Sequence, residues 1–425
     1  MMSNGSNYTL RQGLVAALDI GTDKICCLIA KPLAEVGNDG VANFELVGIG
    51  HCASRGIRSG VVVELDAAES SIRSAVEIAE QMAGENINKV IVGLNSNKIM
   101  SRLVSNETSI GGHQIDNADL KRAIDPSGLN GKLAEGYKLI HVVPVGYSID
   151  GNRGIHDPLG MFGERLGVNL HIVSSSFSVI KNLETVINRC HLDVEKITIS
   201  SLASARATLV DDEEKLGAIC IDMGAGTTSI SVFFENELVH VSVIPVGGAH
   251  ITNDIARGLS TSQFHAERMK TLYGNCMMTT SDETEVIQVP LIGEGEHESH
   301  QIPRRLLVEI IRPRIEEILE LVQKRLIGGG VDKLANRVVL TGGAAQLPGV
   351  IQSAGQILRK NVRLALPKPV KGAANVVAGS PFSAAIGLLH IGFSKSYNAT
   401  DLIQEPLSSS VGRFGKIGQW LSENF

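Results

Sequence analysis

The sequence predicts an α/β protein made of two related halves that hold one ligand between them. A pattern of apolar residues, Asp and Gly-Thr occurs twice, at residues 18–22 and at 221–228. Each copy lies between two short apolar runs, which is typical of a strand, a tight glycine turn and a returning strand. Strands alternate with amphipathic helices, and 425 residues with 43% hydrophobic content can form two or three domains with large cores.

The composition argues against several classes of protein. A net charge of -6 provides no general basic surface, so we expect no binding of nucleic acid. The six cysteines are scattered without a CxxC pair, which indicates reduced thiols rather than a metal or redox centre. No window approaches the length of apolar chain that crosses a membrane, so we expect no transmembrane helix. Residues 1–12 are polar and are expected to form a flexible tail.

The first half is expected to contain strands at residues 14–18, 25–30, 44–50 and 60–65. Asp66 then caps a helix whose apolar residues fall on one face. From Lys89 to about residue 164, strands and turns are broken by Gly-Gly and Asp-Pro pairs, and we interpret this stretch as an inserted subdomain. A strand at 170–173, a helix at 178–190 and a strand at 197–199 complete this half.

The second half begins with the repeated hairpin, with strands at 218–221 and 230–234. Residues 274–301 carry six acidic residues and no Lys or Arg, so we expect an exposed excursion there. A long helix follows from Pro303 to about residue 328, in which Pro313 is expected to cause a kink or a split. A strand at 337–340 and a helix at 381–391 close the globular part.

Both hairpins carry the residue types that a phosphate site needs. Glycine in a tight turn lets backbone N–H groups approach a phosphate closely. Lys24 adds a positive charge, and Asp19 and Asp222 at the strand ends can hold the waters of a Mg²⁺ ion that bridges the phosphates. A single copy would be an ordinary hairpin turn, but the repeat favours a shared ligand site. The expected phosphate-loop residues are Gly21, Thr22, Gly224, Ala225, Gly226, Thr227 and Thr228.

A third glycine site follows the strand at 337–340. Gly342, Gly343 and Ala344 are small and lie where a strand opens into a helix, so a purine or ribose could lie against their backbone. The alternative is a strand-to-helix turn whose small residues serve only the packing of the fold and bind no ligand.

Together, the two hairpins and the third glycine site resemble the pattern of the superfamily of actin, Hsp70 and sugar kinases. Within it, residues 15–24, 217–228 and 339–349, and the order of parts from residue 13 onward, resemble the FtsA family of bacterial cell-division proteins. The resemblance implies an actin-like (ribonuclease H-like) ATPase fold with two duplicated halves, which binds ATP or ADP with Mg²⁺. It also implies that Glu267 and Lys270 lie near the ribose and base; the alternative is a solvated i,i+3 ion pair.

The residue pattern and the resemblance together divide the chain into subdomains. The first core subdomain comprises residues 13–84, 165–205 and 372–393, the insert 85–164, the second core subdomain 206–240 and 310–371, the distal subdomain 241–309, a flexible linker 394–410 and a C-terminal amphipathic helix 411–425.

One departure from the pattern of relatives bears on hydrolysis. Relatives that hydrolyse ATP place a Gln or Glu in the segment before the second phosphate strand, because phosphoryl transfer needs a positioned water. Residues 200–207 offer Arg206 near that point and no carboxylate or amide. We therefore expect ATP binding with slow or absent hydrolysis, and we assign no catalytic residue.

The last fifteen residues place apolar side chains at the spacing of one helical face, beside the only Trp of the chain. After a flexible linker, such a segment suits the surface of an anionic membrane. The alternative is a tail helix docked on the protein's own body or on another protein. One tail would bind weakly, so stable attachment requires many copies in a polymer. The membrane-facing residues are Val411, Phe414, Ile417, Trp420, Leu421 and Phe425.

Arg304 and Arg305, with Arg312 and Arg314, form a basic cluster that could contact an acidic peptide. The alternative is a solvated helix face. In the proteins that the chain resembles, this subdomain receives the C-terminal tail of the tubulin-like protein FtsZ, and the insert is expected to contact other division proteins.

The resemblance thus implies an ATP-binding cell-division protein that self-assembles, binds FtsZ and anchors the Z ring. It would be a peripheral protein on the cytoplasmic side of the cell membrane, at the division site. A sugar or small-molecule kinase is the alternative, and it would need a carboxylate base facing an acceptor pocket. A chaperone would need a substrate-binding domain after the ATPase body. No motif marks either of these.

Overall fold

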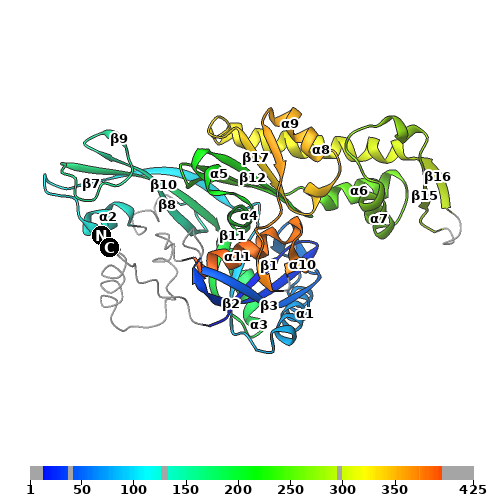
Figure 1. Ribbon diagram of the computed structural model, residues 1–425, viewed down its shortest axis with the longest axis horizontal. Coiled ribbons are helices and arrows are strands. Elements are labelled where there is room, and N and C mark those ends of the chain that lie inside the picture. Colours follow the sequence, from blue (N-terminus) through cyan, green and yellow to red (C-terminus); the bar gives the residue numbers. More distant parts are fainter. Residues whose placement is uncertain (1–12, 37–41, 126–132, 294–298, 373, 395–425) are drawn as a thin grey trace.

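The computed structural model describes residues 13–36, 42–125, 133–293, 299–372 and 374–394. Two central sheets meet in the middle of the molecule, and two arms extend from them in opposite directions (Figure 1). The expected N-terminal tail, nearly all of the linker, and the amphipathic helix at 411–425 lie outside the described residues.

The first half is built on a six-stranded sheet in the order β11-β6-β1-β2-β3-β19. Strands β1, β2 and β3 form an antiparallel meander, and β6 runs parallel to β1. Residues 15–18 of β1 and 25–30 of β2 are buried on both faces of the sheet, which explains why these stretches are apolar without alternation. The strands are β1 (Val15–Ile20), β2 (Lys24–Val36), β3 (Ala42–Ala53), β6 (Lys89–Leu94), β11 (Asp193–Ile199) and β19 (Lys371–Gly372).

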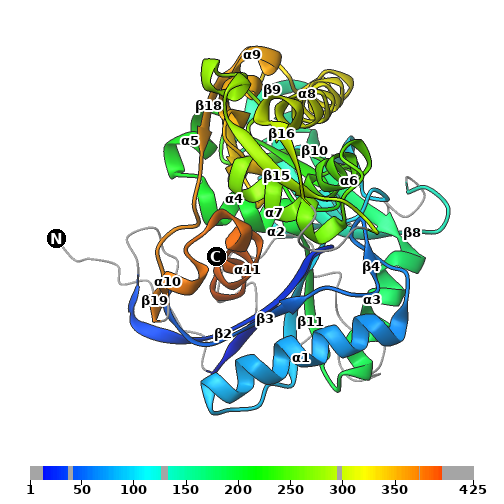
Figure 2. The ribbon, with the colours of Figure 1, turned by 90° about the vertical axis from the view of Figure 1, so that its right-hand side faces the viewer.

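Helices cover both faces of this sheet. α1 (Leu65–Ala83) and α3 (Phe177–Arg189) pack on one face, and α4 (Ser200–Thr208) and α11 (Ser383–Phe393) pack on the other. Figure 2 shows α1 and α11 on opposite sides of β2 and β3. Gly50 lets β3 approach α1 closely, because a Cβ there would lie 2.7 Å from the backbone nitrogen of Ala79. The short pair β4 (Ile57–Arg58) and β5 (Val61–Val62) precedes α1.

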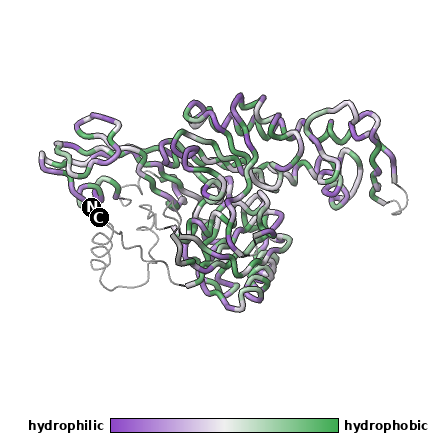
Figure 3. The backbone as a smooth tube through the Cα atoms, in the orientation of Figure 1, coloured by the Kyte–Doolittle hydropathy of each residue, from purple (hydrophilic) through white to green (hydrophobic). Residues whose placement is uncertain are grey.

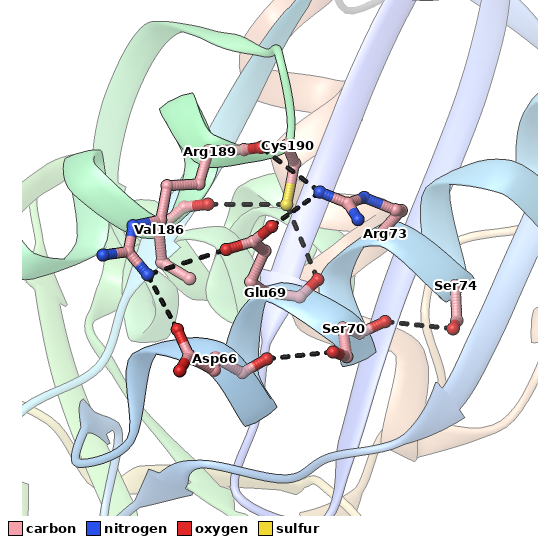
Figure 4. A network of polar contacts seen from close by, with 8 residues as sticks. All are labelled: Asp66, Glu69, Ser70, Arg73, Ser74, Val186, Arg189 and Cys190. Atoms are coloured by element: carbon pink, nitrogen blue, oxygen red, sulfur yellow. Dashed lines mark hydrogen bonds and ion pairs between the residues drawn. The ribbon is translucent and has the colours of Figure 1, made fainter.

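Polar contacts join α1 to the end of α3 (Figure 4). Arg189 lies 2.9 Å from a carboxylate oxygen of Asp66 and 3.7 Å from one of Glu69. Arg73 donates to Glu69 and to the carbonyl of Arg189, and the thiol of Cys190 donates to the carbonyl of Glu69. These contacts hold two helices of one layer together at the molecular surface.

The second half repeats this topology in a five-stranded sheet, in the order β14-β13-β12-β17-β18. β12 pairs antiparallel with β13 and parallel with β17, as β1 does with β2 and β6. The expected duplication of an α/β unit is thereby confirmed. The elements are β12 (Ala218–Met223), β13 (Thr228–Phe234), β14 (Glu237–Ile244), β17 (Arg337–Thr341), β18 (Asn361–Leu364), α5 (Asp211–Leu216) and α9 (Val350–Leu358).

The insert forms one arm, and its limits differ from those expected. β6 belongs to the core sheet, because it pairs with β1 and β11, so the insert begins after Leu94 rather than at residue 85. β10 pairs with β7 and β8, so the insert extends to Ser176 rather than to residue 164. Its elements are β7 (Met100–Ser109), α2 (Asn117–Ile124), β8 (Tyr137–Ile149), β9 (Asn152–Ile155) and β10 (Arg165–Ser176).

The distal subdomain forms the other arm. α8 runs unbroken through Pro313, so the chain is not split into two helices there. Proline removes one backbone donor, but Ile311 and Ile315 on either side of it are fully buried, and this packing holds the helix together. The elements are α6 (Gly248–Gly258), α7 (Gln263–Tyr273), the short helix η2 (Thr280–Glu283), β15 (Val286–Pro290), β16 (Ser299–Pro303) and the first part of α8 (Arg304–Gly328), which continues along the second sheet.

Hydrophobic and hydrophilic stretches alternate along the chain in Figure 3. Across the part of the chain that the structure describes, no helix is long and apolar enough to cross a membrane.

Candidate functional site

The two repeated motifs form the same turn. In the first hairpin, between β1 and β2, the amide of Gly21 donates to the carbonyl of Lys24 at 3.0 Å. In the second, between β12 and β13, the amide of Gly224 donates to the carbonyl of Thr227 at 2.9 Å. Both turns stand at the ends of buried strands, so strand pairing fixes their positions.

The two hairpins meet at Thr22 and Gly226. A Cβ added at Gly226 would overlap the side chain of Thr22, with 2.8 Å between the two Cβ atoms. Only glycine allows this approach, since any side chain would push the hairpins apart. The sequence repeat therefore corresponds to one site shared by both halves.

The third glycine site lies against the second hairpin. Gly342 has φ +89°, and a Cβ there would lie 2.6 Å from the carbonyl oxygen of Met223 and would overlap the carboxylate of Asp222. Parallel pairing of β12 with β17 sets Asp222 opposite Thr341 and so brings the glycine to this place. The structure thus brings together three segments that are far apart in the sequence.

Lys270 and Glu267 lie beside the second hairpin. The ammonium of Lys270 donates to Glu267 at 2.7 Å and to Thr252 at 2.9 Å. A Cβ at Gly248 would lie 3.1 Å from the Cβ of Ala344 and 3.7 Å from the Lys270 nitrogen, so these residues border one space. Glu267 and Lys270 thus form the i,i+3 ion pair that was the alternative to a nucleotide contact, and this pair lies next to the third glycine site.

Asp19 and Asp222 form a half-buried pair of carboxylates at the ends of β1 and β12. Burial raises the pKa of Asp19 to about 6; the charge of Lys24 opposes this shift and that of Asp222 adds to it. Burial also raises the pKa of Asp222, against a hydrogen bond of 2.5 Å from the hydroxyl of Ser204 and the charge of Lys24. A cation placed here would stabilise both ionised carboxylates.

The donor set suits Mg²⁺ held through water. Within the described ranges, no group of three or more His, Cys, Asp or Glu side chains gathers as in a metal cage. Mg²⁺ usually keeps several waters and is bound by one or two carboxylates together with substrate phosphates. Asp19 and Asp222 provide this number of carboxylates beside the phosphate-type turns.

Two polar residues of the site were missed from the sequence. Asn95 donates from its amide nitrogen to the Thr227 hydroxyl at 2.8 Å, while its amide oxygen is buried without a partner among the described residues. Ser204 bonds Asp222. Asn95 directly follows β6, which runs parallel to β1, so its position at the carboxyl end of an apolar strand was the available signal.

Arg206, expected near the attacking water, turns toward α5. Its guanidinium bonds Glu214 at 2.5 Å and lies 5.5 Å from the ring centroid of Phe233. Ser204 is the residue of α4 that bonds Asp222.

The two expected partner-binding arginines differ in their surroundings. Arg304 donates to the carbonyl of Tyr273 and pairs with Glu285 at 2.9 Å and with the fully buried Asp282 at 3.3 Å. Arg305 is half exposed and pairs with acidic side chains on the surface. Arg304 therefore has a structural role, and Arg305 is the one of the two that remains accessible.

Comparison with known proteins places the chain in a family. Residues 219–387 match the model of the cell division protein FtsA, and residues 96–174 match the SHS2 domain inserted in that protein. This second match agrees with the insert limits given by strand pairing.

Solved structures support the fold. The chain is similar to a chain of the PilM-PilN type IV pilus biogenesis complex, with a TM-score of 0.64 and 16% identity over 89% of this chain and 98% of that one. It is also similar to MreB5 of Spiroplasma citri bound to ADP, with a TM-score of 0.51 and 14% identity over 88% of this chain and 94% of that one. The expected actin-like ATPase fold is confirmed.

Curated relatives extend over nearly the whole chain. The cell division protein FtsA of Rhizobium meliloti (strain 1021) is 41% identical, covering 98% of this chain and 96% of its own length. The protein of the same name from Pseudomonas aeruginosa is 34% identical over 97% of this chain and 98% of its own, and that from Escherichia coli (strain K12) is 31% identical with the same coverage. At these identities and coverages, the chain belongs to the FtsA family of cell-division proteins.

Proposed function

We propose that the protein binds Mg-ATP between the two hairpins. The contact of Thr22 with Gly226 beside the half-buried pair Asp19 and Asp222 carries this proposal, because it combines backbone donors, hydroxyls and two carboxylates at one point. Lys24 adds positive charge, and Gly342 to Ala344 with Lys270 border the space for the nucleoside. Mg²⁺ held by the two carboxylates would neutralise the negative charge of the nucleotide phosphates.

The nucleotide is proposed to act as a clamp that holds the two halves in one arrangement. Arg206 is engaged with Glu214, and α4 contains no carboxylate or amide side chain that could position a water at the hairpins. We expect slow or negligible hydrolysis. A single-turnover measurement of phosphate release checks this, and release near the typical enzyme rate of about 10 per second would refute it.

Family membership supports the wider role of a polymerising adaptor. We propose that the chain self-assembles, binds the acidic C-terminal tail of FtsZ through the distal subdomain, and contacts other division proteins through the insert. Residues 411–425 would attach the polymer to lipids on the cytoplasmic side of the membrane at the division site. Many weak tails on one polymer would bind firmly through their high effective concentration.

Nucleotide binding is tested by isothermal titration of the full chain with ATP, with and without Mg²⁺. We expect binding that weakens when Mg²⁺ is removed and when Asp222→Asn is introduced. Leu103→Ser, at an exposed position of the insert, is the matched control and should leave the affinity unchanged. Equal affinity with and without the metal would contradict the proposed role of the two carboxylates.

The adaptor role is tested by co-sedimentation with anionic liposomes, with and without ATP and an FtsZ tail peptide. We expect the intact chain to sediment and to carry the peptide with it, and a chain ending at residue 410 to stay in the supernatant. An intact chain that remains soluble under every condition would refute the adaptor role.

A further inference from the structure

The turn that precedes α11 borders the proposed nucleotide site. It is formed by the short helix η4 (Ser380–Phe382). Lys24 donates from its ammonium to the carbonyl of Pro381 at 3.0 Å, and the same nitrogen lies 3.3 Å from the ring centroid of Phe382. Ser380 donates from its hydroxyl to the carbonyl of Gly342 at 3.2 Å. One turn therefore contacts both the first hairpin and the third glycine site.

The partners of Lys24 are neutral. Within the described residues, its ammonium forms no ion pair with Asp19 or Asp222, although both carboxylates lie near enough to feel its charge. A carbonyl oxygen and the face of an aromatic ring attract an ammonium without cancelling its charge. The positive charge of Lys24 therefore remains available to an anion, and both carboxylates remain available to a cation.

We infer that the Pro381–Phe382 turn positions Lys24 for a nucleotide phosphate by holding its ammonium away from Asp19 and Asp222. This inference rests on the proposed binding of Mg-ATP. Phe382 is a positioning residue, since it acts through Lys24. Without its ring, the ammonium is free to pair with a carboxylate, which removes a phosphate contact and a metal ligand together.

The ring of Phe382 is itself fixed. It meets His51 of β3 edge to face, with 5.8 Å between the ring centroids. Its backbone amide donates to the carbonyl of Gly379, which closes the turn. Lys24 is thus held by a support that the first core sheet and the turn before α11 build together.

The test is a double-mutant cycle on the affinity of the full chain for Mg-ATP, measured by isothermal titration. The variants are Phe382→Leu, which keeps apolar bulk but removes the ring face, Lys24→Met, and the two combined. We expect Phe382→Leu to weaken binding about fivefold, the size of a partly buried cation–π contact. Because Phe382 acts through Lys24, the double variant should bind no more weakly than Lys24→Met alone.

Phe44→Leu is the matched control, because Phe44 stacks on Phe393 at 4.9 Å between ring centroids and pairs with Pro32, toward the opposite end of the β2–β3 pair from Lys24. It should leave the affinity unchanged, and melting temperatures of all variants without nucleotide report on their folding. An unchanged affinity of Phe382→Leu, or losses that multiply in the double variant, would overturn the inference while nucleotide binding stands. A wild-type chain that does not bind Mg-ATP would overturn both.

Discussion

At the scale of single residues, the geometry of the site depends on two glycines, because they lack a Cβ atom. Gly226 and Gly342 lack the Cβ that would collide with Thr22 and with Asp222. Atoms of a neighbouring hairpin occupy the space that each Cβ would need, so a side chain at either position would change the geometry of the site. Two polar side chains complete the site: Asn95 donates a hydrogen bond to Thr227, and Ser204 donates one to Asp222.

Gly226→Ala is expected to separate the hairpins and to lower the affinity for Mg-ATP by about tenfold or more, as a displacement of about 1 Å at a binding site does. Gly328→Ala, at the end of α8, is the matched control, because no atom lies within 4 Å of its new Cβ. Titration calorimetry of both variants measures the difference. Equal effects of the two substitutions would show that the contact with Thr22 is not required.

The ionisation of Asp19 gives a pH dependence. Its pKa is about 6 in the folded chain and about 3.9 in an unfolded one, so its contribution to stability is fully present below the lower value and is lost as the pH rises through the higher one. Mg²⁺ binding needs the ionised form. The rise in melting temperature caused by Mg-ATP should therefore grow from about pH 5 to about pH 7.

Asp19→Asn provides the control for this pH dependence, since ATP also titrates in the same range. The variant should show a smaller and flatter rise in melting temperature than the wild type. A parallel pH profile in the two proteins would assign the dependence to ATP alone.

At the scale of elements, the start of α8 shows how one arginine joins three segments. Arg304 contacts the end of α7 through the Tyr273 carbonyl, η2 through Asp282, and Glu285 before β15. Asp282 is completely buried, so the arginine compensates a charge that would otherwise be isolated. The acidic stretch and the basic cluster, which appear as separate surface features in the sequence, are partly one internal network.

Arg304→Ala is therefore expected to destabilise the chain by about 3 kcal/mol, the typical cost of leaving a buried charge without its partner. Arg305→Ala should leave the free energy of unfolding unchanged, because Arg305 pairs only at the surface. Urea denaturation measures both values. Arg305→Ala should instead weaken binding of the FtsZ tail peptide, and an unchanged peptide affinity would remove Arg305 from the proposed contact.

At the scale of the whole molecule, the insert is seated on both halves through polar contacts. His141 of β8 accepts a hydrogen bond from the amide of Ile199 at 3.3 Å, which ties the insert to the first half. Ser101 of β7 lies 2.7 Å from His171 and accepts from the amide of Val241 at 3.0 Å, which ties the insert to the second half. Its orientation thus depends on the buried His141, which accepts a hydrogen bond in its neutral form, and on Ser101, which also contacts the buried His171.

Acid should therefore loosen the insert. Burial lowers the pKa of both His141 and His171 to about 3, so the stability they contribute is present above about pH 6.5 and is lost as the pH falls toward 3. Each contributes a slope of up to about 1.4 kcal/mol per pH unit in the free energy of unfolding. His141→Gln, whose amide oxygen can still accept from Ile199, should reduce this slope. An equal slope in the variant would exclude His141 as a source.

Features that depend only on neighbouring residues could be predicted from the sequence alone. The repeated hairpin at Asp19 and Asp222, the duplicated halves and the third glycine site follow from local turn chemistry and from apolar periodicity, so they were predicted. The long helix after Pro303 was predicted for the same reason, and it is not split at Pro313.

Contacts between residues that are distant in the chain could not be predicted, because they depend on how the folded chain is arranged. The contact of Thr22 with Gly226, the amide of Asn95 on Thr227 and the hold of Phe382 on Lys24 join positions that are far apart in the chain. The insert limits at Leu94 and Ser176 were likewise set by which sheet each strand joins. The physical reason is that strand pairing and sheet packing, rather than local propensity, bring these atoms within contact distance.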